Sequence, residues 1–256
     1  MTLEVKGLSV TRGHRQVLSN IHFKASPGEL FAIAGPNGAG KSSLLECIVG
    51  TLPCEGEVLV DGVSIRSLAP RERARRVAYV PQRSDLRSAL CVRDVVALGR
   101  YAHGAGLFGR SKGDEEAVEE ALRAMDLGTY AERSFTALSM GEAQRVLIAR
   151  ALATEAPIIL LDEPTAALDI RQSLATLKLL RSLAKRGLTL VAVLHELSAI
   201  HEYADRALLL QDGHMAKVGA AMDVIAPEPI REVYGVDMTR GERWRFELAS
   251  EPEDDA

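Results

Sequence analysis

The loop at residues 35–42 constrains the fold of this chain more than any other segment. It reads Gly-Pro-Asn-Gly-Ala-Gly-Lys-Ser and matches the pattern G-x-x-x-x-G-K-[ST], whose backbone N–H groups cradle phosphates. An apolar run at 30–34, typical of a buried strand, comes directly before it, and the residues from Ser43 onward predict a helix. Since this kind of loop joins a strand to a helix, the sequence predicts an α/β fold with a phosphate site at the end of a strand.

Each residue type in the loop has a chemical role. Glycines let the backbone wrap with its N–H groups pointing inward, and the start of the helix adds a partial positive charge. Lys41 can reach the β- and γ-phosphates of a nucleotide, and Ser42 can be a ligand of Mg²⁺. We therefore expect ATP to bind the loop and the first helical turn, which comprise Gly35, Pro36, Asn37, Gly38, Ala39, Gly40, Lys41, Ser42 and Ser43.

A pair of carboxylates follows a second apolar run. Residues 158–161 read Ile-Ile-Leu-Leu, and Asp162 and Glu163 come directly after them. At the end of a buried strand, Asp162 is placed to hold Mg²⁺, directly or through water, and Glu163 to polarise a water for attack on a γ-phosphate. Taken alone, the pair could be a solvated strand end before Pro164. Together with the phosphate loop it predicts nucleotide hydrolysis.

The composition argues against some partners and compartments. The 31 basic and 35 acidic side chains give a net charge of -4, which argues against nucleic acid as the main partner. The cysteines at 47, 54 and 91 follow no CxxC pattern, so we expect free thiols in a reducing compartment. The first residues lack the apolar core of a signal peptide, and no apolar run approaches the ~20 residues that span a bilayer. We therefore expect a cytoplasmic chain that reaches a membrane only through a partner.

Strands and helices alternate along most of the chain. Hairpin turns are predicted at the Asp-Gly pairs 61–62 and 212–213, and the stretch from about 85 to 155 has a helical pattern. Another helix is predicted after the acidic pair, before a further apolar run at 188–194. This alternation predicts a mostly parallel sheet that is covered by helices and interrupted by a helical insertion.

Four further sequence features accompany the phosphate loop and the carboxylate pair. They are Leu-Ser-Met-Gly-Glu at 138–142, Gln82, Asp169 and His195, the last directly after an apolar run. The ordered set resembles the ATP-binding subunits of ABC transporters, and the resemblance extends over residues 3–237.

The resemblance implies a fold and a division of the chain. We expect a P-loop NTPase core of the ABC ATPase type, with a mostly parallel sheet, an antiparallel β subdomain and a helical subdomain inserted at 85–155. The nucleotide-binding domain would cover 3–237. Residues 238–256 would form a C-terminal tail, whose acidic end is expected to be disordered.

The segment 138–142 has both a local and a functional interpretation. Ser139 and Glu142 form an S-x-x-E capping box, so a helix should begin here. The resemblance implies that this helix N-terminus, with Ser139, Gly141 and Glu142, faces a γ-phosphate bound by a second copy of the chain. The two interpretations are compatible, because an exposed helix N-terminus attracts anions. A head-to-tail dimer would then hold two composite sites.

The resemblance also assigns the three single residues. Gln82 would contact Mg²⁺ and the attacking water, His195 would bind the γ-phosphate, and Asp169 would reach across the dimer interface. Two positions depart from the family pattern. Met140 replaces the first glycine of the signature, and Arg12 stands near where an adenine-stacking aromatic is expected. Arg12 could stack through its guanidinium plane, which leaves some use of GTP open.

Two segments indicate a subgroup. Residues 92–101 and 230–236 resemble bacterial importers of iron chelates, haem and cobalamin. This implies an integral membrane permease dimer, whose cytoplasmic helices dock beside Gln82, and a periplasmic or lipoprotein substrate-binding protein. The chain would lie on the cytoplasmic face of the inner membrane.

Two other functions remain open. A soluble ABC ATPase of translation or DNA repair would usually carry two cassettes or a long coiled coil, and neither pattern is found in this sequence. An exporter subunit would often be fused to a membrane-spanning segment. The genes next to this one, or a pull-down that recovers ribosomes, DNA or a permease, would separate the three.

Overall fold

A six-stranded sheet forms the centre of the computed structural model, which describes residues 1–82, 90–104, 111–240 and 244–248. The strand order is β10-β9-β3-β8-β7-β6. The strands are β3 (Leu30–Ala34), β6 (Val77–Val80), β7 (Ile158–Asp162), β8 (Thr189–Val193), β9 (Arg206–Gln211) and β10 (His214–Ala220). All neighbours are parallel except the edge strand β10, which is antiparallel to β9. Every residue of β3, β7 and β8 is buried, as expected for parallel strands covered on both faces.

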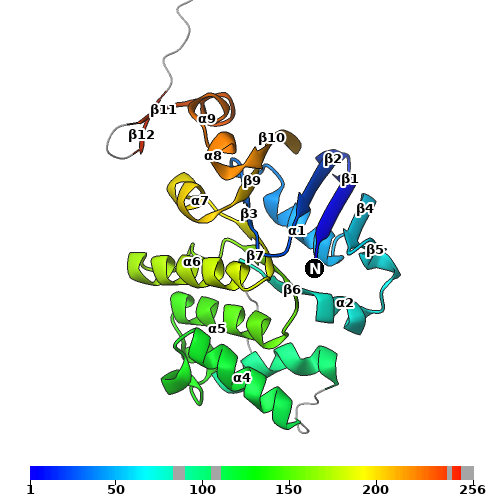
Figure 1. Cartoon of the computed structure of the whole chain (residues 1–256), viewed down its shortest axis with the longest axis vertical. Coiled ribbons are helices and arrows are strands. Elements are labelled where there is room, and N and C mark those ends of the chain that lie inside the picture. Colours follow the sequence, from blue (N-terminus) through cyan, green and yellow to red (C-terminus); the bar gives the residue numbers. More distant parts are fainter. Residues whose placement is uncertain (83–89, 105–110, 241–243, 249–256) are drawn as a thin grey trace, which may run out of the picture.

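A second sheet of four antiparallel strands packs beside the first (Figure 1). Its strands are β1 (Leu3–Arg12), β2 (Arg15–Ala25), β4 (Glu55–Val60) and β5 (Val63–Ser64). The turn between β4 and β5 has positive φ at both central residues, 48° at Asp61 and 79° at Gly62, as an Asp-Gly hairpin requires. Asp212 and Gly213 have the same signs in the β9–β10 turn. The predicted hairpins and the antiparallel subdomain are thus confirmed.

Two hydrophobic clusters lie on opposite faces of the central sheet. Alternate residues of β3 divide between them: Phe31 and Ile33 face the antiparallel sheet and α1 (Lys41–Val49), while Ala32 faces the helices on the other side. Leu44 and Ile48 of α1 are completely buried in the first cluster. The helix that follows the phosphate loop is therefore fixed between two sheets.

Helices occupy the described part of the expected insertion at 85–155. They are α3 (Val92–Ala97), η2 (Leu98–His103), α4 (Lys112–Ala124), η3 (Gly128–Tyr130), η4 (Phe135–Ala137) and α5 (Met140–Ala153). Val118, Ala121 and Leu122 of α4 are buried on one face, in agreement with the helical pattern predicted for this stretch. Figure 1 shows α4 and α5 at one end of the molecule and α9 at the other. Residues 83–89 and 105–110 of the expected insertion lie outside the described residues.

The remaining elements complete the layers. They are η1 (Ile65–Ser67), α2 (Pro70–Arg76), α6 (Ile170–Lys185), α7 (Leu197–Tyr203), α8 (Ala221–Val224), α9 (Pro227–Tyr234), β11 (Val236–Arg240) and β12 (Trp244–Leu248). β11 and β12 pair as an antiparallel hairpin. The domain boundary expected at 237/238 therefore falls inside β11. The sequence did not predict this strand, because its pairing with β12 is not visible in the pattern of a short segment. The expected disordered end at 249–256 lies outside the described residues.

Candidate active site

The phosphate loop connects β3 to α1, as predicted. Gly40 precedes α1 in the left-handed region at φ 98°, and no side chain caps the helix. A Cβ atom at Gly35 would lie 2.2 Å from the carbonyl oxygen of Leu210, and one at Gly40 would lie 2.6 Å from the Leu18 side chain. Side chains other than hydrogen are thus excluded at both positions. The first N–H groups of α1 remain available to a phosphate.

Lys41 is held inside the loop. Its Nζ donates to the carbonyl oxygens of Gly35 at 2.7 Å and Pro36 at 2.9 Å, and the residue is 6% exposed. Burial lowers the pKa of Lys41, while the carboxylates of Glu163 and Asp162 act in the opposite direction. The Lys41 ammonium is thus fixed in the loop, and both Asp162 and Glu163 lie close enough to raise its pKa.

Asp162 ends β7 beside the first turn of α1. It is 3% exposed, and its Oδ1 is buried without a hydrogen-bond partner in the described structure. Burial raises the pKa of Asp162, and a hydrogen bond with Ser42 lowers it. A hydroxyl next to a carboxylate oxygen that lacks a partner is a set of hard oxygen ligands, which suits Mg²⁺. The residues predicted from the sequence therefore fit the ion.

Glu163 lies between two other predicted residues. Gln82 Nε2 donates to its Oε2 at 2.5 Å, and His195 Nε2 lies 2.5 Å from its Oε1. These three residues follow β6, β7 and β8, which are neighbours in the sheet, so their ends meet at one edge. Glu163 has φ 51°, an uncommon conformation for a residue with a side chain and one that is found at functional sites. Gln82 was also expected at Mg²⁺, and its described contact is with Glu163.

The capping box at the start of α5 is confirmed. The Ser139 hydroxyl accepts from the Glu142 N–H at 3.3 Å, and Glu142 Oε2 accepts from the Ser139 N–H at 2.8 Å. These bonds to Ser139 lower the pKa of Glu142, so the first turn of α5 carries a fixed negative charge. Met140 is 67% exposed.

The signature segment packs on the loop before α6. A Cβ at Gly141 would lie 3.1 Å from the Ala167 carbonyl oxygen and 3.2 Å from Gln172 Oε1. Asp169 caps α6 through the Gln172 N–H, at 2.7 Å. Among the described contacts, none joins residues 139–142 or Asp169 to the phosphate loop. One chain thus brings together the loop, Asp162, Glu163, Gln82 and His195, and leaves the signature apart.

A cavity of about 360 Å³ opens beside the phosphate loop. It is lined by Arg12, Arg15, Gln16, Val17, Gly38, Ser43 and Asp212. Arg12 does not extend freely, because its Nη2 pairs with Glu46 Oε2 at 2.7 Å. Sequence reasoning missed this partner, and it also missed Tyr79, which lies beside Asp162 and whose pKa is raised by burial. The only signal for Tyr79 was its place in the strand that leads to Gln82.

Comparisons with known proteins agree with this architecture. Residues 18–166 match the family described as ABC transporter. The hemin import ATP-binding protein HmuV of Pseudomonas entomophila is 43% identical over 242 residues, which cover 92% of this chain and 93% of that protein. A metal-chelate type ABC transporter in an inward-facing conformation superposes with a TM-score of 0.80 at 29% identity, over 96% of both chains.

A dimeric ATP-binding cassette in a post-hydrolysis state, with ADP and phosphate bound, superposes with a TM-score of 0.77 at 29% identity, over 86% of this chain and 98% of that one. The fold and the site together define an ATP-binding cassette. The chain belongs to the ABC transporter family, and it is an ATPase of that family. In the part of the chain that is described, no helix is both long enough and apolar enough to cross a bilayer.

Proposed function

We propose that this chain is the ATP-hydrolysing subunit of a bacterial importer of iron chelates, haem or cobalamin. The observation that carries the proposal is the 43% identity to a hemin import ATP-binding protein over 92% of the chain. The likeness to a metal-chelate type transporter over 96% of the chain supports the same subgroup. The segments 92–101 and 230–236 resemble that subgroup as well.

Hydrolysis would use the residues that meet at the carboxyl ends of β6, β7 and β8. Lys41 and the N–H groups of the loop would hold the β- and γ-phosphates, and Ser42, Asp162 and Gln82 would hold Mg²⁺, which would offset the phosphate charge. Glu163 accepts a proton from the water that attacks the γ-phosphorus. The contacts of Gln82 and His195 with the Glu163 carboxylate support this role, because they orient its oxygens.

The complete site would need a second copy of the chain. Ser139, Gly141 and Glu142 begin a helix whose N-terminus does not reach the phosphate loop of its own chain. In a head-to-tail dimer this N-terminus would face the γ-phosphate on the partner, and Asp169 would lie at the interface. A dimeric cassette of the same fold, with ADP and phosphate bound, supports this arrangement.

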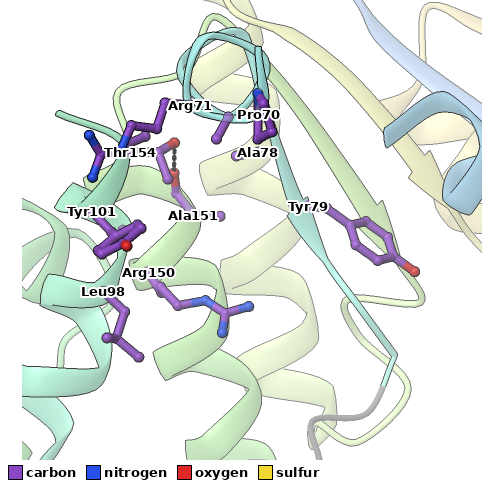
Figure 2. A pocket seen from close by; sticks show the side chains of 12 residues that line it. Pro70, Arg71, Ala78, Tyr79, Leu98, Tyr101, Arg150, Ala151 and Thr154 are labelled. Atoms are coloured by element: carbon purple, nitrogen blue, oxygen red, sulfur yellow. Dashed lines mark hydrogen bonds between the residues drawn. The ribbon is translucent and has the colours of Figure 1, made fainter. Parts of the chain in front are cut away.

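Transport would require a permease dimer in the membrane, with a periplasmic or lipoprotein substrate-binding protein on the other side. The cassette would then lie at the cytoplasmic face of the inner membrane. A groove of about 350 Å³ suits the docking of a permease segment. It lies between α2 and β6 of the core and η2 and α5 of the helical insertion (Figure 2). A permease segment bound in this groove would contact both the core and the helical insertion, so a movement between these two parts would displace it.

The test uses Glu163→Gln in the cassette co-expressed with the permease of the transporter. The variant should bind ATP, accumulate as a nucleotide-bound dimer and lose at least about 100-fold in turnover, because the water then lacks its base. Full hydrolysis by this variant would remove Glu163 from the mechanism. Recovery of ribosomes or DNA in place of a membrane protein would favour a soluble ABC ATPase. Outward transport in vesicles would favour an exporter.

A further inference from the structure

Two of the three cysteines lie together at the end of the helix that follows the phosphate loop. Cys47 is part of α1 and is 2% exposed. After the helix ends, the N–H groups of Thr51 and Leu52 both donate to the carbonyl oxygen of Glu46, so the chain turns back over the end of α1. It then reaches Cys54, which packs against the hydrophobic cluster that contains Cys47. The turn thus places two free thiols next to one another.

The two thiols have different surroundings. Burial raises the pKa of the Cys47 thiol, and the neighbouring Cys54 thiol raises it further. Cys54 is only half-buried, and its Sγ accepts a hydrogen bond from Arg66 Nη2 at 2.8 Å. The same nitrogen donates to the Cys54 carbonyl oxygen, so two contacts hold the guanidinium beside this cysteine. A cation next to a sulfur stabilises the thiolate, which is the form that reacts with oxidants. The pair therefore combines an accessible sulfur beside a cation with a protected thiol.

The third cysteine lies in a contrasting environment. Cys91 is also half-buried, but its Sγ donates to Asp94 Oδ2 at 3.1 Å. A carboxylate next to a sulfur disfavours the thiolate. The only other cysteines of the chain belong to the pair at the end of α1. Cys91 therefore serves as an internal reference for a thiol with neither a neighbouring cation nor a neighbouring cysteine to react with.

We propose that Cys47 and Cys54 form a site of reversible oxidation, at which a peroxide converts the two thiols into a disulfide that lowers ATP turnover. The Cys54 thiolate attacks one oxygen of hydrogen peroxide, the O–O bond breaks, and a sulfenic acid forms while the other oxygen leaves as water after protonation. The Cys47 sulfur then displaces the sulfenic oxygen, which leaves as a second water with the Cys47 proton. Two electrons pass from the sulfurs to the peroxide. The inference goes beyond the proposed function and is independent of the cargo.

The disulfide would act on the nucleotide site through α1. An S–S bond is about 2.05 Å long, shorter than a non-bonded contact between two sulfur atoms, so its formation pulls the segment at Cys54 onto the end of the helix. Glu46, the neighbour of Cys47, accepts the hydrogen bonds of the turn and pairs with Arg12 at 2.7 Å. Arg12 lines the cavity beside the phosphate loop. A displacement at the cysteines thus reaches groups around the nucleotide without changing the loop itself.

The experiment uses the full-length cassette, first reduced with dithiothreitol and then treated with hydrogen peroxide. Peptide mass spectrometry without reduction should find Cys47 joined to Cys54, while Cys91 is still a thiol when half of the pair has reacted. ATP turnover should fall by about fivefold or more, because small displacements around bound substrate are costly for the rate, and it should return after dithiothreitol. Cys54→Ser, at the half-buried position, should keep the turnover of the reduced wild type and become insensitive to peroxide. Cys91→Ser is the matched control and should respond as the wild type does.

A second variant tests the role of the cation. Arg66→Gln keeps both thiols and should slow disulfide formation by about threefold or more at equal peroxide, because the thiolate loses its neighbouring charge. Arg186→Gln, at an exposed arginine on the C-terminal cap of α6, should leave the rate unchanged.

Three results would overturn the inference. The first is the absence of the peptide that links Cys47 to Cys54 when Cys91 is already oxidised. The second is a linked protein that hydrolyses ATP as fast as the reduced one, because the disulfide would then not act on α1. The third is a loss of turnover that occurs equally in Cys54→Ser or persists after dithiothreitol, because the damage would then lie elsewhere.

Discussion

The Nε2 atom of His195 lies 2.5 Å from Oε1 of Glu163, although the two residues are 32 positions apart. This contact fixes one oxygen of the carboxylate, and Gln82 fixes the other. The proposed base is therefore oriented by its neighbours, and we also expect His195 to bind a γ-phosphate. A residue that orients the base and contacts the phosphate should affect the chemical step more than nucleotide binding.

We expect His195→Ala to reduce the ATP turnover number by about 100-fold, the effect of losing one positioned polar group. The KM for ATP should change by less than about threefold, because the phosphate loop remains intact. Steady-state hydrolysis at several ATP concentrations measures both values. His22→Ala, at an exposed histidine that does not line the cavity beside the phosphate loop, is the control. A variant at position 195 that keeps half of the turnover would contradict the assignment.

Asp162→Asn should raise the Mg²⁺ concentration needed for half-maximal hydrolysis by at least about tenfold, since an ionised ligand becomes a neutral one. The structural reason is its buried Oδ1, which has no hydrogen-bond partner among the described residues. Titration of ATP turnover against Mg²⁺ at fixed ATP tests it. An unchanged titration curve would remove Asp162 from the metal site.

Met140→Gly should leave ATP turnover unchanged or raise it. The side chain is 67% exposed on its own chain, so its removal affects the proposed interface more than the fold. Gly141→Ala gives the contrast, because its Cβ would lie 3.1 Å from the Ala167 carbonyl oxygen, and turnover should fall several-fold. Both are measured on the purified cassette at saturating ATP. A large fall in Met140→Gly would show that the methionine contributes to the interface.

ATP and GTP should compete with KM values within about tenfold of one another. A guanidinium stacks on the face of any purine without reading its edge, and Arg12 lines the cavity beside the phosphate loop. Arg12→Tyr should lower the KM for both nucleotides, and Arg12→Ala should raise both. Hydrolysis of each nucleotide, alone and in mixture, gives these values. A preference for ATP above 100-fold would exclude stacking by Arg12 as the main contact with the base.

Asp114 should contribute to stability in a pH-dependent way. Its hydrogen bonds with Arg100, followed by those with Ser111, lower the pKa of Asp114 from 3.8 to about 2. Since the folded value lies below the unfolded one, the stabilisation is complete above pH 3.8 and is lost as the pH falls towards 2. Asp114→Asn should therefore be less stable than the wild type at pH 7, and the difference should shrink towards pH 3. Urea unfolding at the two pH values measures it, and a constant difference would refute the pairing.

The phosphate loop and the helix start at Ser139 could be located from the sequence because their signals are local. Glycines at fixed spacing, a strand before them and a helix after them identify the phosphate loop, and Ser139 with Glu142 identifies a helix start. These features depend on backbone conformation and on contacts within a few residues. The same holds for the hairpin turn at Asp61 and Gly62.

Other features could not be predicted from local sequence patterns. The partner of Arg12, the exposure of Leu174 within a leucine-bearing helix and the β11–β12 hairpin all depend on which segments become neighbours. Leu174 is 43% exposed although Leu177 and Leu180 of the same helix are buried. The period of a helix predicts an apolar face, but the packed surface decides how wide the buried part is.

By itself, the sequence determined which residues we expect to bind phosphate, Mg²⁺ and a nucleophilic water, since short-range geometry and side-chain chemistry suffice for each expectation. Only the tertiary structure decided that Gln82 and His195 share the two oxygens of Glu163, and that Arg100 pairs with Asp114 and Glu155. The reason is that strand order and helix packing, which arise from burial over the whole chain, set the distances between residues far apart in sequence.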